Sequence, residues 1–216
     1  MFTDKKPGKY TILLGDIINS SRYNGVQKKL HDAAEWINRQ FDICWQTPLE
    51  ITRGDEVAVI AKPNNCWFRS ILRFNDRIRP LRMRWVMVYG EIKEGLVYQS
   101  SSEATGPAFI DADQLMHKLK KSNLRFDIST GASRWDDILR GHINLLLWRI
   151  DQLSDLQLQV FRLYQTRKRQ IDVAQSLGRS QQQIQRALKA MNWQVIDAAE
   201  ESALKLVTLA MEEITS

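Results

Sequence analysis

Cysteine, histidine and long apolar runs are scarce in this chain of 216 residues. It has two cysteines and three histidines, and none of them has the spacing typical of a zinc site. We expect Cys44 and Cys66 to be buried free thiols rather than a disulfide. No apolar run approaches the roughly 20 residues that cross a bilayer, and the first residues lack an apolar signal region. These absences predict a cytoplasmic protein with no membrane partner.

Most of the chain also has no net charge. The formal net charge is +6, and the segment 162–189 accounts for all of it, with seven basic residues and one acid, Asp172. The remaining residues carry equal numbers of basic and acidic groups. A neutral body with one basic segment is typical of nucleic-acid-binding proteins. The alternative is a solvated helix face that happens to be basic.

The basic segment has the pattern of two short helices joined by a tight turn. Gly178 suits the left-handed residue that ends the first helix, and Ser180 suits the N-cap of the second. The expected core-facing positions are Ile171, Ala174 and Leu177, followed by Ile184, Ala187 and Leu188. This pattern predicts a helix-turn-helix, whose second helix lies in the major groove of DNA.

The exposed face of this motif is expected to contact double-stranded DNA. Glutamine can pair with adenine and arginine with guanine in two-point fashion, whereas lysine mainly positions the protein on phosphates. The predicted contact residues are Arg167, Lys168, Arg169, Arg179, Ser180, Gln181, Gln182, Gln185, Arg186 and Lys189. A helical hairpin that binds other proteins remains the alternative.

The first half of the chain alternates between strand and helix patterns. Strands are expected over 10–15, 49–52, 57–60, 84–89 and 125–128, and helices over 26–41, 67–78 and from 106 to 115. This order predicts an α+β fold, in which a ferredoxin-like, mainly antiparallel sheet carries helices on one face. An all-α helix-turn-helix domain follows it.

We therefore expect a palm-type domain over 1–132, a helical connector over 133–152 and the helix-turn-helix domain over 153–216. The last of these ends in a long helix over 193–214. That helix either closes the core of the small domain or forms the seam of a homodimer, and the sequence supports both alternatives. Its apolar positions include Val195, Ile196, Ala199, Ala203, Leu206 and Met211.

Three acidic residues stand at expected strand ends. Asp16 follows the first strand, and Asp55 and Glu56 lie in a hairpin turn. If these carboxylates converge, a hard divalent cation such as Mg²⁺ or Mn²⁺ would relieve their repulsion and could hold the phosphates of a nucleotide ligand. Ordinary turn chemistry is the alternative explanation for the Gly-Asp pair.

Several motifs resemble known families. The segments Leu14-Gly15-Asp16-Ile17, Gly54-Asp55-Glu56 and Gly106-Pro107-Ala108 resemble the palm core of class III nucleotide cyclases and GGDEF-type diguanylate cyclases. That resemblance implies Asp16 and Asp55 as metal ligands. The helical segment from Leu153 resembles region 4 of sigma factors. The combination is similar, over nearly the whole chain, to the SatD family.

The chain departs from the cyclase pattern at the positions that carry the chemistry. The cyclase lysine that reads the base corresponds to Ile51, and the asparagine and arginine that steady the transition state correspond to Ile110 and Gln114. The first glycine of the GGDEF motif is replaced by Arg53. Without positive charge at the reacting phosphate, much of the rate enhancement is lost. The sequence therefore favours a binding domain over a working enzyme.

These observations together predict a cytoplasmic DNA-binding transcriptional regulator of the SatD type, with a degenerate cyclase-like domain for a metal or nucleotide ligand. One alternative is a metal-dependent nucleotidyl-transfer enzyme with an accessory helix-turn-helix. Another is an interaction module that contacts RNA polymerase.

Overall fold

The structure is a computed structural model that describes residues 8–52, 54–93, 100–101 and 104–216; Arg53 lies outside them. Its internal contacts define two compact units, one formed by Met1–Gly141 with Leu206–Ser216 and the other by His142–Lys205. The division falls within two continuous helices, α4 (Ser133–Asp151) and α8 (Trp193–Thr215). The expected boundaries at 132 and 152 stay predictions.

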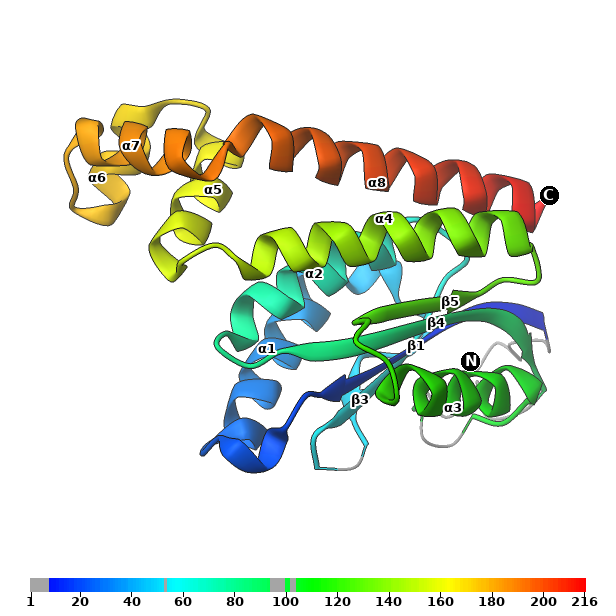
Figure 1. The fold of residues 1–216 in the computed structure, drawn as a ribbon. Helices are drawn as coiled ribbons and strands as arrows, with labels where there is room; N and C mark the ends of the chain where they lie inside the picture. Colours follow the sequence, from blue (N-terminus) through cyan, green and yellow to red (C-terminus); the bar gives the residue numbers. More distant parts are fainter. Residues whose placement is uncertain (1–7, 53, 94–99, 102–103) are drawn as a thin grey trace. The chain divides into compact units, whose positions relative to one another are not determined.

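The first unit is built on a five-stranded sheet with the order β2-β3-β1-β4-β5 (Figure 1). All neighbouring strands are antiparallel except β4 and β5, which are parallel. The strands are β1 (Gly8–Ile17), β2 (Glu50–Ile51), β3 (Glu56–Ala61), β4 (Met83–Ile92) and β5 (Phe126–Ser129). The helices between them are α1 (Val26–Gln40), α2 (Cys66–Ile78) and α3 (Pro107–Lys120). The first four strands with α1 and α2 form the ferredoxin-like βαββαβ unit, so the expected α+β fold is confirmed.

Helices cover both faces of this sheet. Ile12 of β1 and Val88 of β4 belong to the apolar cluster formed with Ala108 and Ala112 of α3. Trp85 of β4 points to the opposite face, where its ring packs edge-on against Phe74 of α2 at 5.3 Å between centroids. The expectation that the helices share one face holds for α1 and α2 but not for α3. The reason is that β1 and β4 carry apolar residues on both faces, and each face needs a cover.

The two cysteines differ from the expectation of free thiols. Cys44 and Cys66 form a disulfide, with their Cα atoms 5.6 Å apart. Backbone pairing places them together: Trp45 bridges Ala61, and the amide of Lys62 donates to the carbonyl of Cys44 at 2.9 Å. A sequence separation of 22 residues gave no sign of this proximity. Because structural disulfides are rare in the cytoplasm, the cytoplasmic location stays a prediction.

The second unit is helical. Its complete helices are α5 (Asp155–Arg167), α6 (Gln170–Leu177) and α7 (Gln181–Met191). Ser154 and Ser180 cap α5 and α7 with reciprocal capping boxes, and Gly178 ends α6 in the left-handed conformation with φ of 59°. The caps predicted at Gly178 and Ser180 are thus confirmed. Among the expected core positions, Ala174, Ile184 and Leu188 are buried, Leu177 and Ala187 are half-buried, and Ile171 is exposed.

Helix α8 uses its apolar positions mainly inside the chain. Ile196, Ala203 and Met211 are buried, whereas Val195 is exposed. The two alternatives for α8, closing the core of the small domain and forming the seam of a homodimer, stay predictions. Within the described ranges, no helix has the length and apolar character needed to cross a membrane.

Candidate functional site

Helix α7 presents a polar and basic outer face. Ile184, Leu188 and Met191 are buried, so the side chains between them point outward. All ten residues predicted to contact DNA are exposed: Arg167, Lys168, Arg169, Arg179, Ser180, Gln181, Gln182, Gln185, Arg186 and Lys189. The structure thus leaves every predicted contact side chain available to a partner.

The N-terminus of α7 is tightly defined by its cap. The hydroxyl of Ser180 accepts from the amide of Gln183 at 3.3 Å, and the side-chain oxygen of Gln183 accepts from the amide of Ser180 at 3.0 Å. Gln183 is consequently held as a capping residue. Gln182, Gln185 and Arg186 are exposed and remain the predicted readers of base edges.

One basic residue of the segment has a structural role. The guanidinium of Arg162 lies 2.5 Å from Glu200, and the two side chains are only 14% and 10% exposed. Gln165 donates to the same glutamate at 3.0 Å and to Asp197 at 2.9 Å. Arg162 therefore belongs to a buried polar network between α5 and α8, whereas the other six basic residues of the segment are exposed.

A second polar cluster lies on the α3 face of the sheet. The antiparallel register places Asp16 opposite Glu56 on β3 and opposite Arg84 on β4. Directly opposed side chains of neighbouring strands lie close together. Lys120, the last residue of α3, completes the cluster: its ammonium lies 2.6 Å from Asp16 and 3.2 Å from Glu56.

The charges of this cluster balance. Arg84 lies 3.5 Å from the second oxygen of Asp16, whose side chain is 9% exposed. Burial lowers the pKa of Lys120, but hydrogen bonds and charge attraction from Asp16 and Glu56 outweigh burial and raise that pKa. Lys120 is therefore protonated at neutral pH, and two cations neutralise two carboxylates.

The predicted metal residues are only partly brought together. Asp16 and Glu56 meet, but Asp55 forms no ion pair with Lys120 or Arg84; its backbone carbonyl accepts from the amide of Ile17 at 3.2 Å. In the part of the chain that the structure describes, no three acidic, histidine or cysteine side chains form a group able to hold a metal ion. The arrangement does not fit an Mg²⁺ or Mn²⁺ ion, because the ammonium of Lys120 lies between the two carboxylates.

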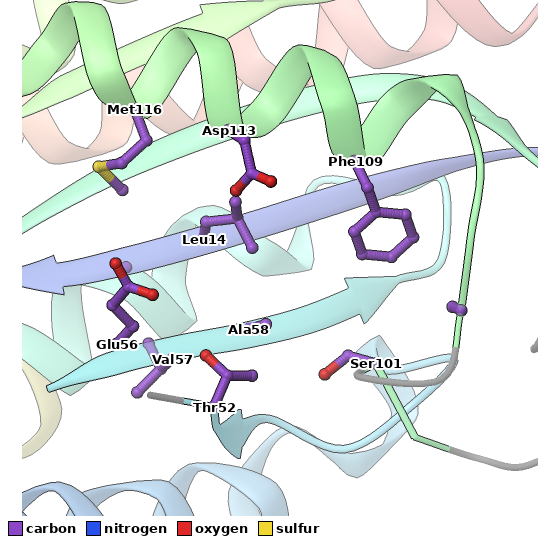
Figure 2. Close-up of a pocket in the computed structure, with 11 residues that line it drawn as sticks. Leu14, Thr52, Glu56, Val57, Ala58, Ser101, Phe109, Asp113 and Met116 are labelled. Carbon is purple, nitrogen blue, oxygen red and sulfur yellow. The ribbon is translucent and has the colours of Figure 1, made fainter. Parts of the chain in front are cut away.

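A pocket of about 270 Å³ adjoins this cluster (Figure 2). Phe109, Asp113 and Met116 extend from α3 toward the strands, and Glu56 and Thr52 approach from the other side. Asp113 adds a carboxylate to the wall, and Glu56 in the same wall is paired with Lys120. Sequence reasoning missed Arg84 and Lys120, because only the fold brings them beside Asp16. It also missed Asp113, which shares the wall of the pocket with Glu56.

The glycines of the cyclase-like motifs have packing roles here. A Cβ atom at Gly15 would lie 2.7 Å from both Met83 Sδ and Val57 Cγ2. At Gly106 it would lie 2.7 Å from the carbonyl oxygen of Glu91. Both motif glycines are thus required by the close approach of neighbouring segments, independently of any catalytic role.

Comparison with known proteins identifies one family. The model of the SatD family matches residues 10–207. No curated protein sequence matches the chain.

Similar solved structures are cyclases. A bacterial light-regulated adenylyl cyclase has 12% sequence identity and a TM-score of 0.45, over 60% of this chain and 79% of that chain. A second structure of such a cyclase has 12% identity and a TM-score of 0.46, over 61% and 46%. The guanylyl cyclase Cya2 has 14% identity and a TM-score of 0.34, over 52% and 71%.

Proposed function

This chain belongs to the SatD family, and from that premise and the outer face of α7 we propose that the protein binds double-stranded DNA as a transcriptional regulator. The observation that carries the proposal is the coincidence of charge and exposure. The excess positive charge of the chain is confined to one segment, and six of its seven basic residues are exposed.

The composition of α7 supports insertion into the major groove. The helix contains no acidic residue, and its exposed residues include the amides of Gln181, Gln182 and Gln185 and the cations of Arg186 and Lys189. Gln182, Gln185 and Arg186 can form two-point hydrogen bonds to purines, and Lys189 can contact a phosphate. The only acid of the segment, Asp172, lies 3.9 Å from Arg169 and is partly compensated by it.

A duplex-binding titration at several salt concentrations tests the proposal. We expect the Arg186→Ala/Lys189→Ala variant to bind more weakly than the wild-type protein. Its plot of log affinity against log salt should also be shallower, by about one unit of slope for each lost phosphate contact. Fluorescence anisotropy of a labelled duplex measures both quantities.

A matched control removes two positive charges elsewhere. Lys28 and Lys118 are exposed residues of α1 and α3, so the Lys28→Ala/Lys118→Ala variant has the same net charge as the test variant. It should keep the affinity and slope of the wild-type protein. Absence of duplex binding at low salt, or equal losses in both variants, would contradict the proposed groove contact.

The acidic cluster does not favour the nucleotidyl-transfer alternative. That reaction needs carboxylates that hold a divalent cation against a phosphate, and here Asp16 and Glu56 are already neutralised by Lys120 and Arg84. We propose instead that the palm-type domain serves as a scaffold for the DNA-binding unit. Contact with RNA polymerase stays the remaining alternative for α7, to be preferred if the duplex titration fails.

A further inference from the structure

The pocket beside the acidic cluster has no role in the proposed DNA binding. It lies between one face of α3 and the strands β1 and β3, and all the residues that line it belong to the first unit. Its volume of about 270 Å³ is slightly below the roughly 300–1,000 Å³ typical of pockets for drug-sized ligands. The pocket therefore has the size for a small organic molecule.

Among the described lining residues, Asp113 carries the one charge without a partner. The other charged side chain of the wall is Glu56, which is paired with Lys120 at 3.2 Å. Asp113 forms no hydrogen bond or ion pair with any residue that the structure describes. Its carboxylate extends from α3 toward Leu14 of β1 (Figure 2). A carboxylate in this position favours a ligand that carries a positive charge.

The remaining polar side chains of the wall also favour a ligand that donates hydrogen bonds. The hydroxyl of Ser101 donates to Glu50 at 2.9 Å, so its oxygen can only accept from a ligand. One oxygen of Glu56 accepts from Lys120, and the second is a further acceptor. Thr52 can donate or accept. Among the described side chains of the wall, acceptors thus outnumber donors.

The rest of the wall is mainly apolar. Phe109, Asp113 and Met116 are separated by four and three residues, so they share one face of α3, with Asp113 between the other two (Figure 2). Leu14 and Ala58 line the pocket from the strands. An aromatic ring such as that of Phe109 packs against an apolar body and also attracts a cation over its face.

We propose that this pocket binds a small organic amine in its protonated form. The ammonium group lies against Asp113, and the apolar body of the ligand packs between Phe109, Met116 and the sheet. An alkyl ammonium stays charged at neutral pH, as the lysine side chain does. A ligand with one positive charge is favoured, because one carboxylate of the wall lacks a cation. The scaffold role proposed above makes no use of this site.

Calorimetric titration of the full chain with phenethylamine tests the proposal. Phenethyl alcohol is the neutral counterpart of this probe, and phenylacetate is the anionic one. We expect the amine to bind about tenfold or more tighter than the alcohol, because only the amine forms a charge-assisted hydrogen bond with Asp113. Phenylacetate should not bind. Equal affinities for the amine and the alcohol, or tighter binding of the anion, would overturn the proposal. So would a failure of phenethylamine, tryptamine and hexylamine to bind at millimolar concentrations.

Asp113→Asn and Asp111→Asn form a matched pair of variants. Each removes one negative charge from an exposed position of α3, but Asp111 does not line the pocket. Asp113→Asn should lose the preference for the amine over the alcohol and keep the melting temperature of the wild-type protein. Asp111→Asn should bind both probes as the wild-type protein does. Equal losses in the two variants would mean that the amine is attracted only by the general charge of the helix, and would contradict the site.

Methionine methyl signals in NMR spectra locate the bound molecule. Met116 lines the pocket, so the ring of phenethylamine should shift the signal of its methyl group, which the Met116→Leu variant identifies. The signal of Met211, in α8, should not move. A shift at Met211 without one at Met116 would place the amine elsewhere and overturn the proposal. These measurements contain no DNA, so their outcome is independent of the proposed DNA binding.

Discussion

Lys120, at the end of α3, holds Asp16 of β1 through an ion pair of 2.6 Å. The same ammonium lies 3.2 Å from Glu56 of β3. A cation supplied by the chain therefore stands between two of the three carboxylates that the sequence suggested as metal ligands. In this arrangement the ion pairs of Lys120 link α3 to the sheet. Replacing the lysine should therefore change the stability of the protein.

Replacement of Lys120 by methionine should leave two carboxylates facing each other. We expect Lys120→Met to lower the free energy of unfolding by about 1–2 kcal/mol, less than for a fully buried pair because Lys120 is partly exposed. Mn²⁺ should raise the melting temperature of this variant but not that of the wild-type protein. Lys121→Met, at the exposed neighbouring position, is the control. A wild-type protein stabilised by Mn²⁺ would instead support a metal site at Asp16 and Glu56.

The raised pKa of Lys120 also predicts a pH dependence. A lysine whose pKa is higher in the folded state contributes stability that is fully present below its ordinary value of 10.5 and is lost as pH rises through the raised value. The difference in unfolding free energy between the wild-type protein and Lys120→Met should thus be constant near neutral pH and shrink above about pH 10.5. Urea unfolding at a series of pH values measures it. A difference in unfolding free energy that grows with pH would contradict the raised pKa of Lys120.

Arg162 should behave as a core residue although it lies in the basic segment. Arg162→Met leaves the carboxylate of Glu200 buried without its charged partner, with only Gln165 still donating to it. We expect a loss of about 3 kcal/mol in the free energy of unfolding. The double variant Arg162→Met/Glu200→Leu should recover much of this loss, because it removes both buried charges. The salt dependence of DNA binding should not change in the folded double variant. A shallower salt slope there would place Arg162 at the DNA instead.

Two positions of α7 should affect DNA binding differently. Gln185→Ala should weaken binding to the preferred sequence by about 1–3 kcal/mol and relax the preference at one base pair. Lys189→Ala should weaken binding to all sequences about equally and reduce the salt slope by about one. Parallel titrations of specific and random duplexes distinguish these effects. If both variants lost the same affinity for specific and random duplexes and the same salt slope, Gln185 would contact only the phosphate backbone.

The elements of this fold follow closely from local sequence. Strands β1 to β5 and helices α1, α2, α4 and α8 lie within a few residues of their predicted ranges. The caps at Gly178 and Ser180 are where turn chemistry placed them. These features depend on residues three or four positions apart, and such spacings can be read directly from the chain.

Contacts between distant segments could not be read in this way. The disulfide between Cys44 and Cys66, the pairing of Arg162 with Glu200, and the place of α3 on the second face of the sheet all depend on how elements pack. In the acidic cluster, the sequence identified Asp16 and Glu56 but not Lys120, which is 64 residues from Glu56 along the chain.

By itself, the sequence determined the helices and strands, the antiparallel α+β order and the basic segment, because periodicity, capping and charge are properties of neighbouring residues. Only the tertiary structure decided which charges are neutralised and which remain free. It buried Arg162 against Glu200, left Arg186 and Lys189 exposed, and placed Lys120 between Asp16 and Glu56. The physical reason is that ion pairing and burial depend on distance in space, and the packing of the elements sets that distance.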